Sequence, residues 1–379
     1  MVRTAPRLCL ALASAALVLG CGGAQGGASP GLTGAALPSC SAFPAPTPVT
    51  SAPASDVIEY PVPGLIGVDQ LVGGPDGNLW FTGTASGSQL AAVGQITPGG
   101  QATLHPLPTP SGFDGITAGP DGDIWFAEST ALKVGRLVPA TGRIDEFVVQ
   151  QPSRPPRNTQ VRDIVAGPDG NLWFDVQQVA QEAVMPAGYV GRVTPAGAVT
   201  LYPVPGGDQP VGIQVGADGA LWSRVAVADA SKAPCGTLPG YTPTDRVVRV
   251  TTAGAVSEMS ESNPQFAGDV IGPDGDRWWM TSSGAMRRTA PSGRVTVIPA
   301  QRSLGLWDAF RFVFGPDGSA WYVDGSSILR MTTTGQITSY HGRGTNSGAT
   351  WVTRGPDNRM WFVEGASGAS AVGAIRPAH

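Results

Sequence analysis

The chain has 379 residues, of which 41% are hydrophobic and 14% are charged, and it contains 53 glycines and 35 prolines. This length is sufficient for a large core, and many turn residues without an alternating helical pattern predict an all-β protein. Lysine and arginine together number 24, against 28 acidic residues. No basic stripe is present, so we expect no nucleic-acid partner.

The first 20 residues predict a lipoprotein signal peptide. Arg3 and Arg7 precede an apolar stretch that runs from Leu8 to Leu19, and the residues up to Cys21 resemble a bacterial lipobox. The apolar stretch is too short to span a bilayer. We therefore expect Cys21 to carry a lipid that anchors the protein on the extracytoplasmic side of a bacterial membrane. The alternative is an ordinary cleaved signal peptide that contains a cysteine by chance.

Residues 21–55 are rich in proline, alanine, glycine and serine, a composition that cannot bury a core. They predict a flexible tether. Periodic strand patterns begin at Asp56, so we expect residues 56–379 to form one folded domain.

An eight-residue phrase recurs seven times along this domain. It reads GPDGNLWF twice, and its copies follow one another at intervals of 40 to 56 residues, which is typical of a propeller repeat. The copies begin at Gly74, Gly119, Gly167, Gly216, Gly272, Gly315 and Gly355. Each repeat predicts four short strands, A to D, in which the phrase forms the hairpin between A and B. The fold class is therefore a seven-bladed β-propeller of four-stranded blades.

The aspartate and the second glycine of the phrase predict a tight turn, in which the aspartate accepts backbone hydrogen bonds and the glycine adopts a left-handed conformation. A calcium site is the alternative use for aspartates in repeated turns, but it requires several carboxylates on one ion. The tryptophan of the phrase predicts packing between neighbouring blades, because a buried indole supplies a large apolar area.

The two ends of the domain predict how the ring closes. After the seventh phrase the chain provides strands B and C but no strand D, whereas an unassigned strand, VIEYPVP, occupies residues 57–63. This N-terminal strand is expected to complete blade 7 by pairing near residues 371–376. Closure of this kind leaves no long exposed edge.

The phrase GPDGxLWF, followed by VGRxTPxG and a strand ending in PLP or PVP, resembles the streptogramin B lyase (virginiamycin B lyase) family over about 300 residues. The resemblance implies a seven-bladed propeller. It also implies an enzyme that opens a cyclic depsipeptide antibiotic by elimination at its ester, with a histidine base and a magnesium ion near the central axis.

The resemblance places the site of the family in blades 6 and 7, and this chain departs from it there. The two histidine positions, five residues before the phrase, hold Phe310 and Thr350, and the two glutamate positions hold Gly348 and Glu364. Only Glu364 is retained. The histidine position of blades 1 to 5 is occupied by Asp69, Asp114, Arg162, Val211 and Ala267. The histidines that the chain does have, His105, His341 and His379, are expected on outer strands or at the C-terminus.

Acidic and aromatic residues nevertheless gather where strand A begins and strand B ends. We expect them at the mouth of the central channel, where they would bind a cation, a sugar-like ligand or a peptide. The candidate binding residues are Asp69, Asp114, Glu128, Arg162, Trp307, Asp308, Asp324, Trp351 and Glu364. The alternative is a solvated rim without a ligand, in which these carboxylates pair with arginines.

The cysteines predict one disulfide. Cys9 leaves with the signal peptide and Cys21 is lipidated, so Cys40 and Cys235 remain outside the cytoplasm and are expected to pair. Two free or intermolecular thiols are the alternative.

Two classes of function stay open at this stage. The first is a membrane-tethered, monomeric scaffold that binds a small molecule, a glycan or a protein and needs no cofactor. The second is a divergent carbon–oxygen lyase or hydrolase that uses rim carboxylates and magnesium. The missing histidines favour the first class, because histidine is the usual base near neutral pH.

Overall fold

The computed structural model describes residues 49–85, 91–150, 159–178, 188–207, 209–227, 242–260, 270–280, 285–298, 312–324, 327–342, 348–365 and 371–376. The chain divides into two units, Met1–Phe43 and Pro44–His379, and all described residues belong to the second unit. Two short 3-10 helices occur, η1 (Ala54–Asp56) and η2 (Pro205–Gly207). Within these ranges no helix has the length and apolar character needed to cross a membrane.

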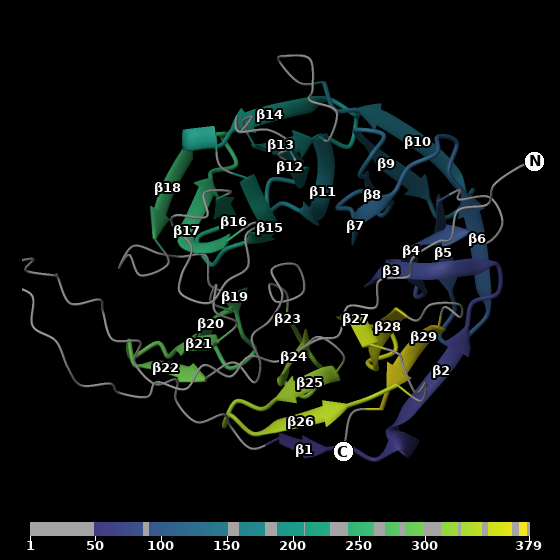
Figure 1. Ribbon diagram of the computed structural model, residues 1–379, viewed down its shortest axis with the longest axis vertical. Coiled ribbons are helices and arrows are strands. Elements are labelled where there is room, and N and C mark those ends of the chain that lie inside the picture. Colours follow the sequence, from purple (N-terminus) through teal and green to yellow (C-terminus); the bar gives the residue numbers. More distant parts are fainter. Residues whose placement is uncertain are drawn as a thin grey trace, which may run out of the picture. The chain divides into compact units, whose positions relative to one another are not determined.

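Seven antiparallel sheets form a ring, so the predicted all-β propeller of seven four-stranded blades is confirmed (Figure 1). Blades 1 to 3 consist of β3 (Leu65–Gly73), β4 (Leu79–Ala85), β5 (Ala91–Ile96) and β6 (Ala102–Pro106); β7 (Phe113–Ala118), β8 (Ile124–Glu128), β9 (Lys133–Val138) and β10 (Arg143–Val148); and β11 (Thr159–Ala166), β12 (Leu172–Gln178), β13 (Tyr189–Val193) and β14 (Val199–Pro203).

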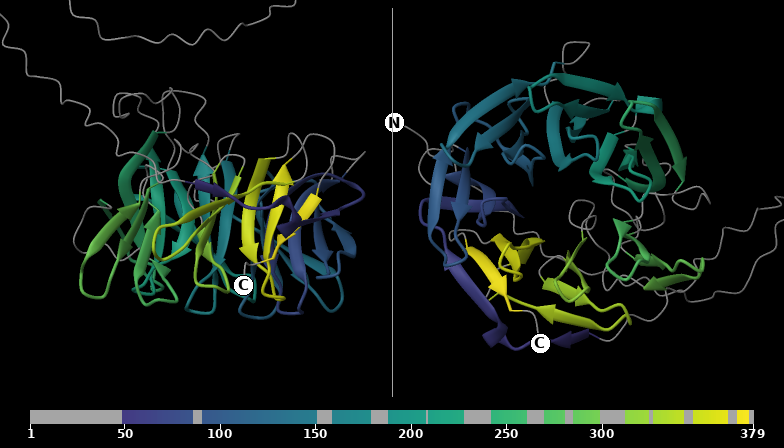
Figure 2. Two further views of the ribbon diagram at one scale, coloured as in Figure 1. Left: turned by 90° about the horizontal axis from the view of Figure 1, so that it is seen from below. Right: turned by 180° about the vertical axis from the view of Figure 1, so that it is seen from behind.

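Blades 4 to 7 repeat this order. They consist of β15 (Gln209–Val215), β16 (Leu221–Val227), β17 (Thr242–Val250) and β18 (Val256–Ser260); β19 (Val270–Ile271), β20 (Arg277–Met280), β21 (Met286–Thr289) and β22 (Val295–Ile298); β23 (Phe312–Phe314), β24 (Ala320–Asp324), β25 (Ser327–Met331) and β26 (Ile337–Tyr340); and β27 (Gly348–Arg354), β28 (Met360–Gly365), β29 (Ala371–Ile375) and β2 (Val57–Pro61). In every blade the first strand of the repeat lies nearest the centre of the ring (Figures 1 and 2).

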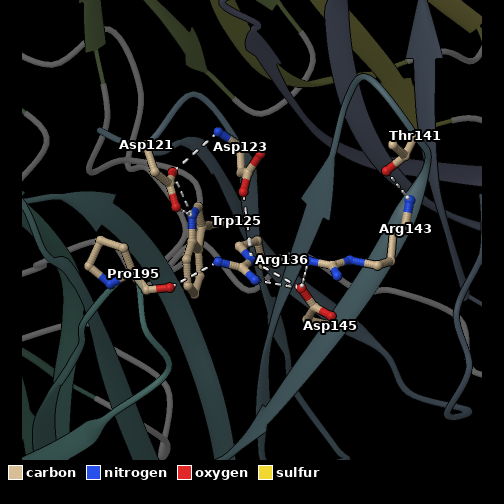
Figure 3. Close-up of polar contacts among 8 residues, drawn as sticks. All are labelled: Asp121, Asp123, Trp125, Arg136, Thr141, Arg143, Asp145 and Pro195. Carbon is tan, nitrogen blue, oxygen red and sulfur yellow. Dashed lines mark hydrogen bonds and ion pairs between the residues drawn. The ribbon is translucent and has the colours of Figure 1, made fainter.

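The repeated phrase forms the A–B hairpin, as predicted, and blade 2 shows why its residues recur. Asp121 accepts a hydrogen bond from the backbone N–H of Asp123 at 3.2 Å and from the indole N–H of Trp125 at 3.0 Å (Figure 3). Gly122 has φ of 84°. A Cβ on Gly119 would lie 2.5 Å from Cδ1 of Trp125, so the first glycine gives the indole room to fold back over the turn. In blade 7 Asn358 replaces the second glycine and keeps the left-handed conformation, with φ of 61°.

The phrase tryptophans pack between blades, which confirms that prediction. Trp80 of blade 1 is fully buried against Ile116 and Phe126 of blade 2. An arginine on strand C adds a second connection between blades: Arg136 lies over the ring of Trp125 and donates to the carbonyl of Pro195 in blade 3 at 2.9 Å (Figure 3). Neighbouring blades are therefore joined by both apolar packing and hydrogen bonds.

The ring closes as predicted, because β2 pairs antiparallel with β29 and supplies the outer strand of blade 7. Val57 lies opposite Ile375, and Pro61 lies opposite Ala371. The strand is shorter than the 57–63 segment expected from sequence, since it ends at Pro61.

One further strand precedes the expected start of the domain. β1 (Val49–Ser51) pairs in parallel with β26 and forms a fifth, outermost strand of blade 6. The backbone N–H of Ala52 continues the pairing by donating to the carbonyl of Ser339 at 2.8 Å. Among the described residues, the first strand therefore lies within the segment assigned by composition to the tether, because a three-residue edge strand needs backbone groups and not an apolar pattern.

Candidate functional site

The inner strands of five blades carry an irregular register about five residues before the phrase. The shifts lie between Val68 and Leu71, Phe113 and Ile116, Arg162 and Ile164, Val211 and Gln214, and Ala349 and Trp351. A β-bulge redirects a side chain and often lies next to a binding site. The residues that occupy the family's histidine position, Asp69, Asp114, Arg162, Val211 and Thr350, therefore lie in or beside a bulge on the inner strand of their blade.

Asp69 is the ionisable residue of this position in blade 1. Its side chain is accessible to water. Protein atoms surround it on the inner face of the ring, however, and the partial loss of hydration that they cause raises the pKa of Asp69 to about 6. The carboxylate has no hydrogen bond or ion pair with the described residues. Asp69 is therefore an acid without a counter-charge among the described residues, and its raised pKa brings its ionisation closer to neutral pH.

Asp114 and Arg162 occupy the same position in blades 2 and 3, and they form an ion pair across the boundary between these blades. Arg162 also donates through Nη1 to Oε1 of Gln177 at 3.4 Å. Gln177 is buried and donates to the carbonyl of Pro210 in blade 4. This chain of contacts holds the guanidinium in one place and neutralises Asp114, in contrast to Asp69.

Glu128 ends strand β8 and is fully buried, so it does not lie on a solvated rim. Neither carboxyl oxygen has a hydrogen-bond partner among the described residues. Burial and, to a smaller extent, the charge of Glu146 raise the pKa of Glu128 to about 8, and the charge of Lys133 opposes the shift. Lys133 itself pairs with Glu146 at 2.5 Å and donates to Oγ1 of Thr109. Glu128 is thus an interior group whose ionisation is disfavoured by its surroundings.

Glu364 is the last residue but one of strand β28 and is also buried. Its Oε1 lies so close to Gly342, which follows strand β26 of blade 6, that a Cβ there would collide with it. Glu364 therefore lies within the boundary between blades 6 and 7 instead of at an open mouth.

Trp351 connects blade 7 to blade 1. Its indole N–H donates to the carbonyl of Leu71 in blade 1 at 2.7 Å, and its ring packs against the core between blades 7 and 1. Asp324 is the last residue of β24. Trp307 and Asp308 lie outside the described residues, as do Cys21, Cys40 and Cys235, so the lipidation and disulfide predictions remain predictions.

The residues in the family's site positions do not fit a magnesium ion. Of the described positions, Gly348 and Thr350 offer no carboxylate or imidazole, and Glu364 is packed against Gly342. Within the described ranges no three or more His, Cys, Asp or Glu side chains form a group that could hold a metal. We therefore derive no step through magnesium.

Sequence reasoning missed a second polar contact between blades. Ser223 Oγ donates to Oδ2 of Asp175 at 3.0 Å, across the boundary between blades 3 and 4, and both side chains are buried. A signal was available, because the eighth position of the phrase is aromatic in six copies and serine only in the fourth.

Taken together, the sheets, the bulged inner strands and the tryptophan-lined boundaries define a seven-bladed β-propeller with an ionisable inner face. The chain resembles the virginiamycin B lyase family, whose model matches residues 51–231. This match covers blades 1 to 3 and the first two strands of blade 4, and it ends before blades 6 and 7, where the family's site positions fall. No curated protein matches the chain.

Solved structures confirm the fold. The virginiamycin B lyase of Staphylococcus aureus is 21% identical with a TM-score of 0.63, and the alignment covers 85% of this chain and 99% of that one. The same lyase in a catalytically inactive form with quinupristin is 20% identical with a TM-score of 0.62, covering 84% and 99%. A structure described as YCF48 bound to D1 peptide is 12% identical with a TM-score of 0.57, covering 87% and 100%. At these identities the likeness concerns the fold.

Proposed function

We propose that the protein is a ligand- or protein-binding propeller, tethered by a lipid at Cys21 to the extracytoplasmic side of a bacterial membrane, and that it does not act as a streptogramin B lyase. The observation that carries this proposal is which residues occupy the bulged position on the inner strands. In blades 1 to 3 this position holds Asp69 and the ion pair of Asp114 and Arg162. In blades 6 and 7, where the family has histidines at this position, the chain has Phe310 and Thr350.

The position of the histidines supports the proposal. Among the described residues, His105 lies on the outer strand β6, where it stacks on Trp80, and His341 follows the outer strand β26. Neither lies on an inner strand, so neither is placed to remove a proton from a ligand at the centre of the ring.

The partner is a small molecule, a glycan or a protein held by a rigid ring, and the chain acts as a monomer without a cofactor. The propeller of YCF48, which has a similar fold, is described with a bound peptide. Binding by loops and inner faces on a rigid scaffold is common to propellers of many functions.

One observation favours an alternative, a divergent carbon–oxygen lyase or hydrolase. A carboxylate that is accessible to water and has its pKa raised to about 6 by burial, as Asp69 does, is suited to general-base catalysis near neutral pH. In that case Asp69 would remove the proton, in place of the histidine of the family.

Turnover of a streptogramin B separates the two functions. Purified protein is incubated with quinupristin, with and without magnesium, and the linear product is sought by mass spectrometry. We expect no product. Magnesium-dependent opening that is lost in Glu364→Gln would overturn the proposal, and opening that is lost in Asp69→Asn would establish the alternative.

The anchor is tested separately. The wild type is expected to remain with the membrane fraction until detergent is added and to incorporate a labelled fatty acid, whereas Cys21→Ser is expected to do neither. Release of the wild type without detergent would support an ordinary cleaved signal peptide.

A further inference from the structure

The same inner position in three consecutive blades carries an unequal balance of charge. It contains two carboxylates, Asp69 and Asp114, and one guanidinium, Arg162. The guanidinium pairs with Asp114 and is fixed from behind by the buried Gln177. Among the described residues, one negative charge on this part of the inner face is therefore left without a counter-charge, and it belongs to Asp69.

Within the part of the chain that the structure describes, other charged groups close to Asp69 do not compensate its charge. Blade 2 presents Asp114, which already has its partner. On the other side, β27 carries Arg354, whose backbone lies beside Gly73 at the turn end of β3 and whose Nη2 donates to Oδ1 of Asn358 at 2.7 Å. The shift of the Asp69 pKa accordingly has desolvation as its cause, without a contribution from a charge.

An aromatic ring flanks the same strand. The indole N–H of Trp351 in blade 7 donates to the carbonyl of Leu71, two residues beyond Asp69. This bond holds the indole against the inner strand of blade 1. The indole is only half-buried, and the neighbouring Thr350 is exposed. A carboxylate, a hydroxyl and a partly exposed indole are groups that together favour an organic cation, through ion pairing, hydrogen bonding and contact with the ring face.

We propose that Asp69, with Trp351 and Thr350, forms a binding site for a protonated amine, such as the ammonium group of a small molecule or of a peptide side chain, at the inner boundary of blades 1 and 7. This inference rests on the proposed binding function and names its ligand class. It assigns Asp69 the role of counter-charge, and it assigns Arg162 and Asp114 the role of a neutral, fixed wall beside the site.

The test uses 4-fluorobenzylammonium as the probe and 4-fluorobenzyl alcohol as its uncharged counterpart, with binding followed by fluorine NMR line broadening and titration. The ammonium probe is expected to bind the wild type at pH 8 and to bind at least about tenfold more weakly in Asp69→Asn. At pH 5 binding is expected to fall by a similar factor, because Asp69 is then protonated. The alcohol is expected to bind at least tenfold more weakly than the ammonium at pH 8.

Glu59→Gln is the matched control, since it removes one carboxylate from the outer strand β2 and should leave binding unchanged. Equal affinity of the probe for Asp69→Asn and for the wild type would overturn the inference, as would absence of binding at pH 8 or equal binding of the alcohol. These outcomes differ from the failure of the proposed function, which would appear as opening of quinupristin whatever the affinity for the amine.

Discussion

Arg162 of blade 3 neutralises Asp114 of blade 2, although both residues occupy the position that the family's histidines hold in blades 6 and 7. Both side chains are about one-fifth exposed, so the pair is partly shielded from water. Where the structure describes this position in blades 2 and 3, it therefore holds an ion pair between blades.

The ion pair is expected to stabilise the boundary between blades 2 and 3. Arg162→Met should lower the free energy of unfolding by about 1 kcal/mol, because it leaves Asp114 and the buried Gln177 without their donor. In the double variant Arg162→Met with Asp114→Asn, part of this loss should be recovered. Urea unfolding of the four proteins measures the coupling, and strictly additive losses would show that the pair does not contribute.

Glu128 is expected to make stability fall as the pH rises. Its pKa is about 8 in the folded protein against an ordinary value of 4.5, so below pH 4.5 the carboxyl is protonated in both states and costs nothing. Between pH 4.5 and 8 the unfolded chain ionises while the folded protein does not, and stability is progressively lost. At about 1.4 kcal/mol per pKa unit, the loss above pH 8 amounts to several kcal/mol.

Glu128→Gln removes this ionisation. The free energy of unfolding of the variant, relative to that of the wild type, should increase from pH 4.5 to pH 9. Urea unfolding of both proteins at these two pH values measures this difference. Glu59→Gln, on the outer strand β2, should show no such gain. If the difference between Glu128→Gln and the wild type were the same at both pH values, Glu128 would not be the group that titrates.

The N-terminal strands are expected to be essential for a closed ring. A chain that starts at residue 64 lacks both β1 and β2, so the backbone groups of β29 that pair with Val57–Pro61 become exposed. This chain should aggregate or show a lower melting temperature. A chain that starts at residue 41 keeps both strands and serves as the control. If both chains had equal melting temperatures and both eluted as monomers, the pairing of β2 with β29 would not contribute to the stability of the propeller.

The cysteines that follow the anchor are expected to form a disulfide between Cys40 and Cys235. Intact-mass measurement of the oxidised monomer after thiol alkylation, without reductant, should show no added alkyl group at these two residues. Two added groups would identify free thiols, and a dimer that dissociates on reduction would identify an intermolecular bond.

Much of this protein is determined by its sequence alone. The repeated phrase predicts seven blades because each copy contains the residues that form its own turn. In blade 2 the carboxylate of Asp121 accepts a hydrogen bond from the backbone of the same turn. The left-handed residue of the turn is Gly122 in blade 2 and Asn358 in blade 7. The missing last strand likewise predicts that residues 57–63 complete blade 7, since an open edge needs a partner, and residues 57–61 do so. These features are local, or follow from counting strands.

The properties of the candidate site depend on contacts between blades, which only the tertiary structure decided. Glu128 and Glu364 lie at or next to the last residue of equivalent strands and resemble rim carboxylates in the sequence, but both are buried. Asp69 and Asp114 share one position, and of these two only Asp114 meets an arginine among the described residues. Burial, pairing and pKa depend on side chains contributed by the next blade, and on bulges that redirect them, so a pattern read within one repeat does not contain them.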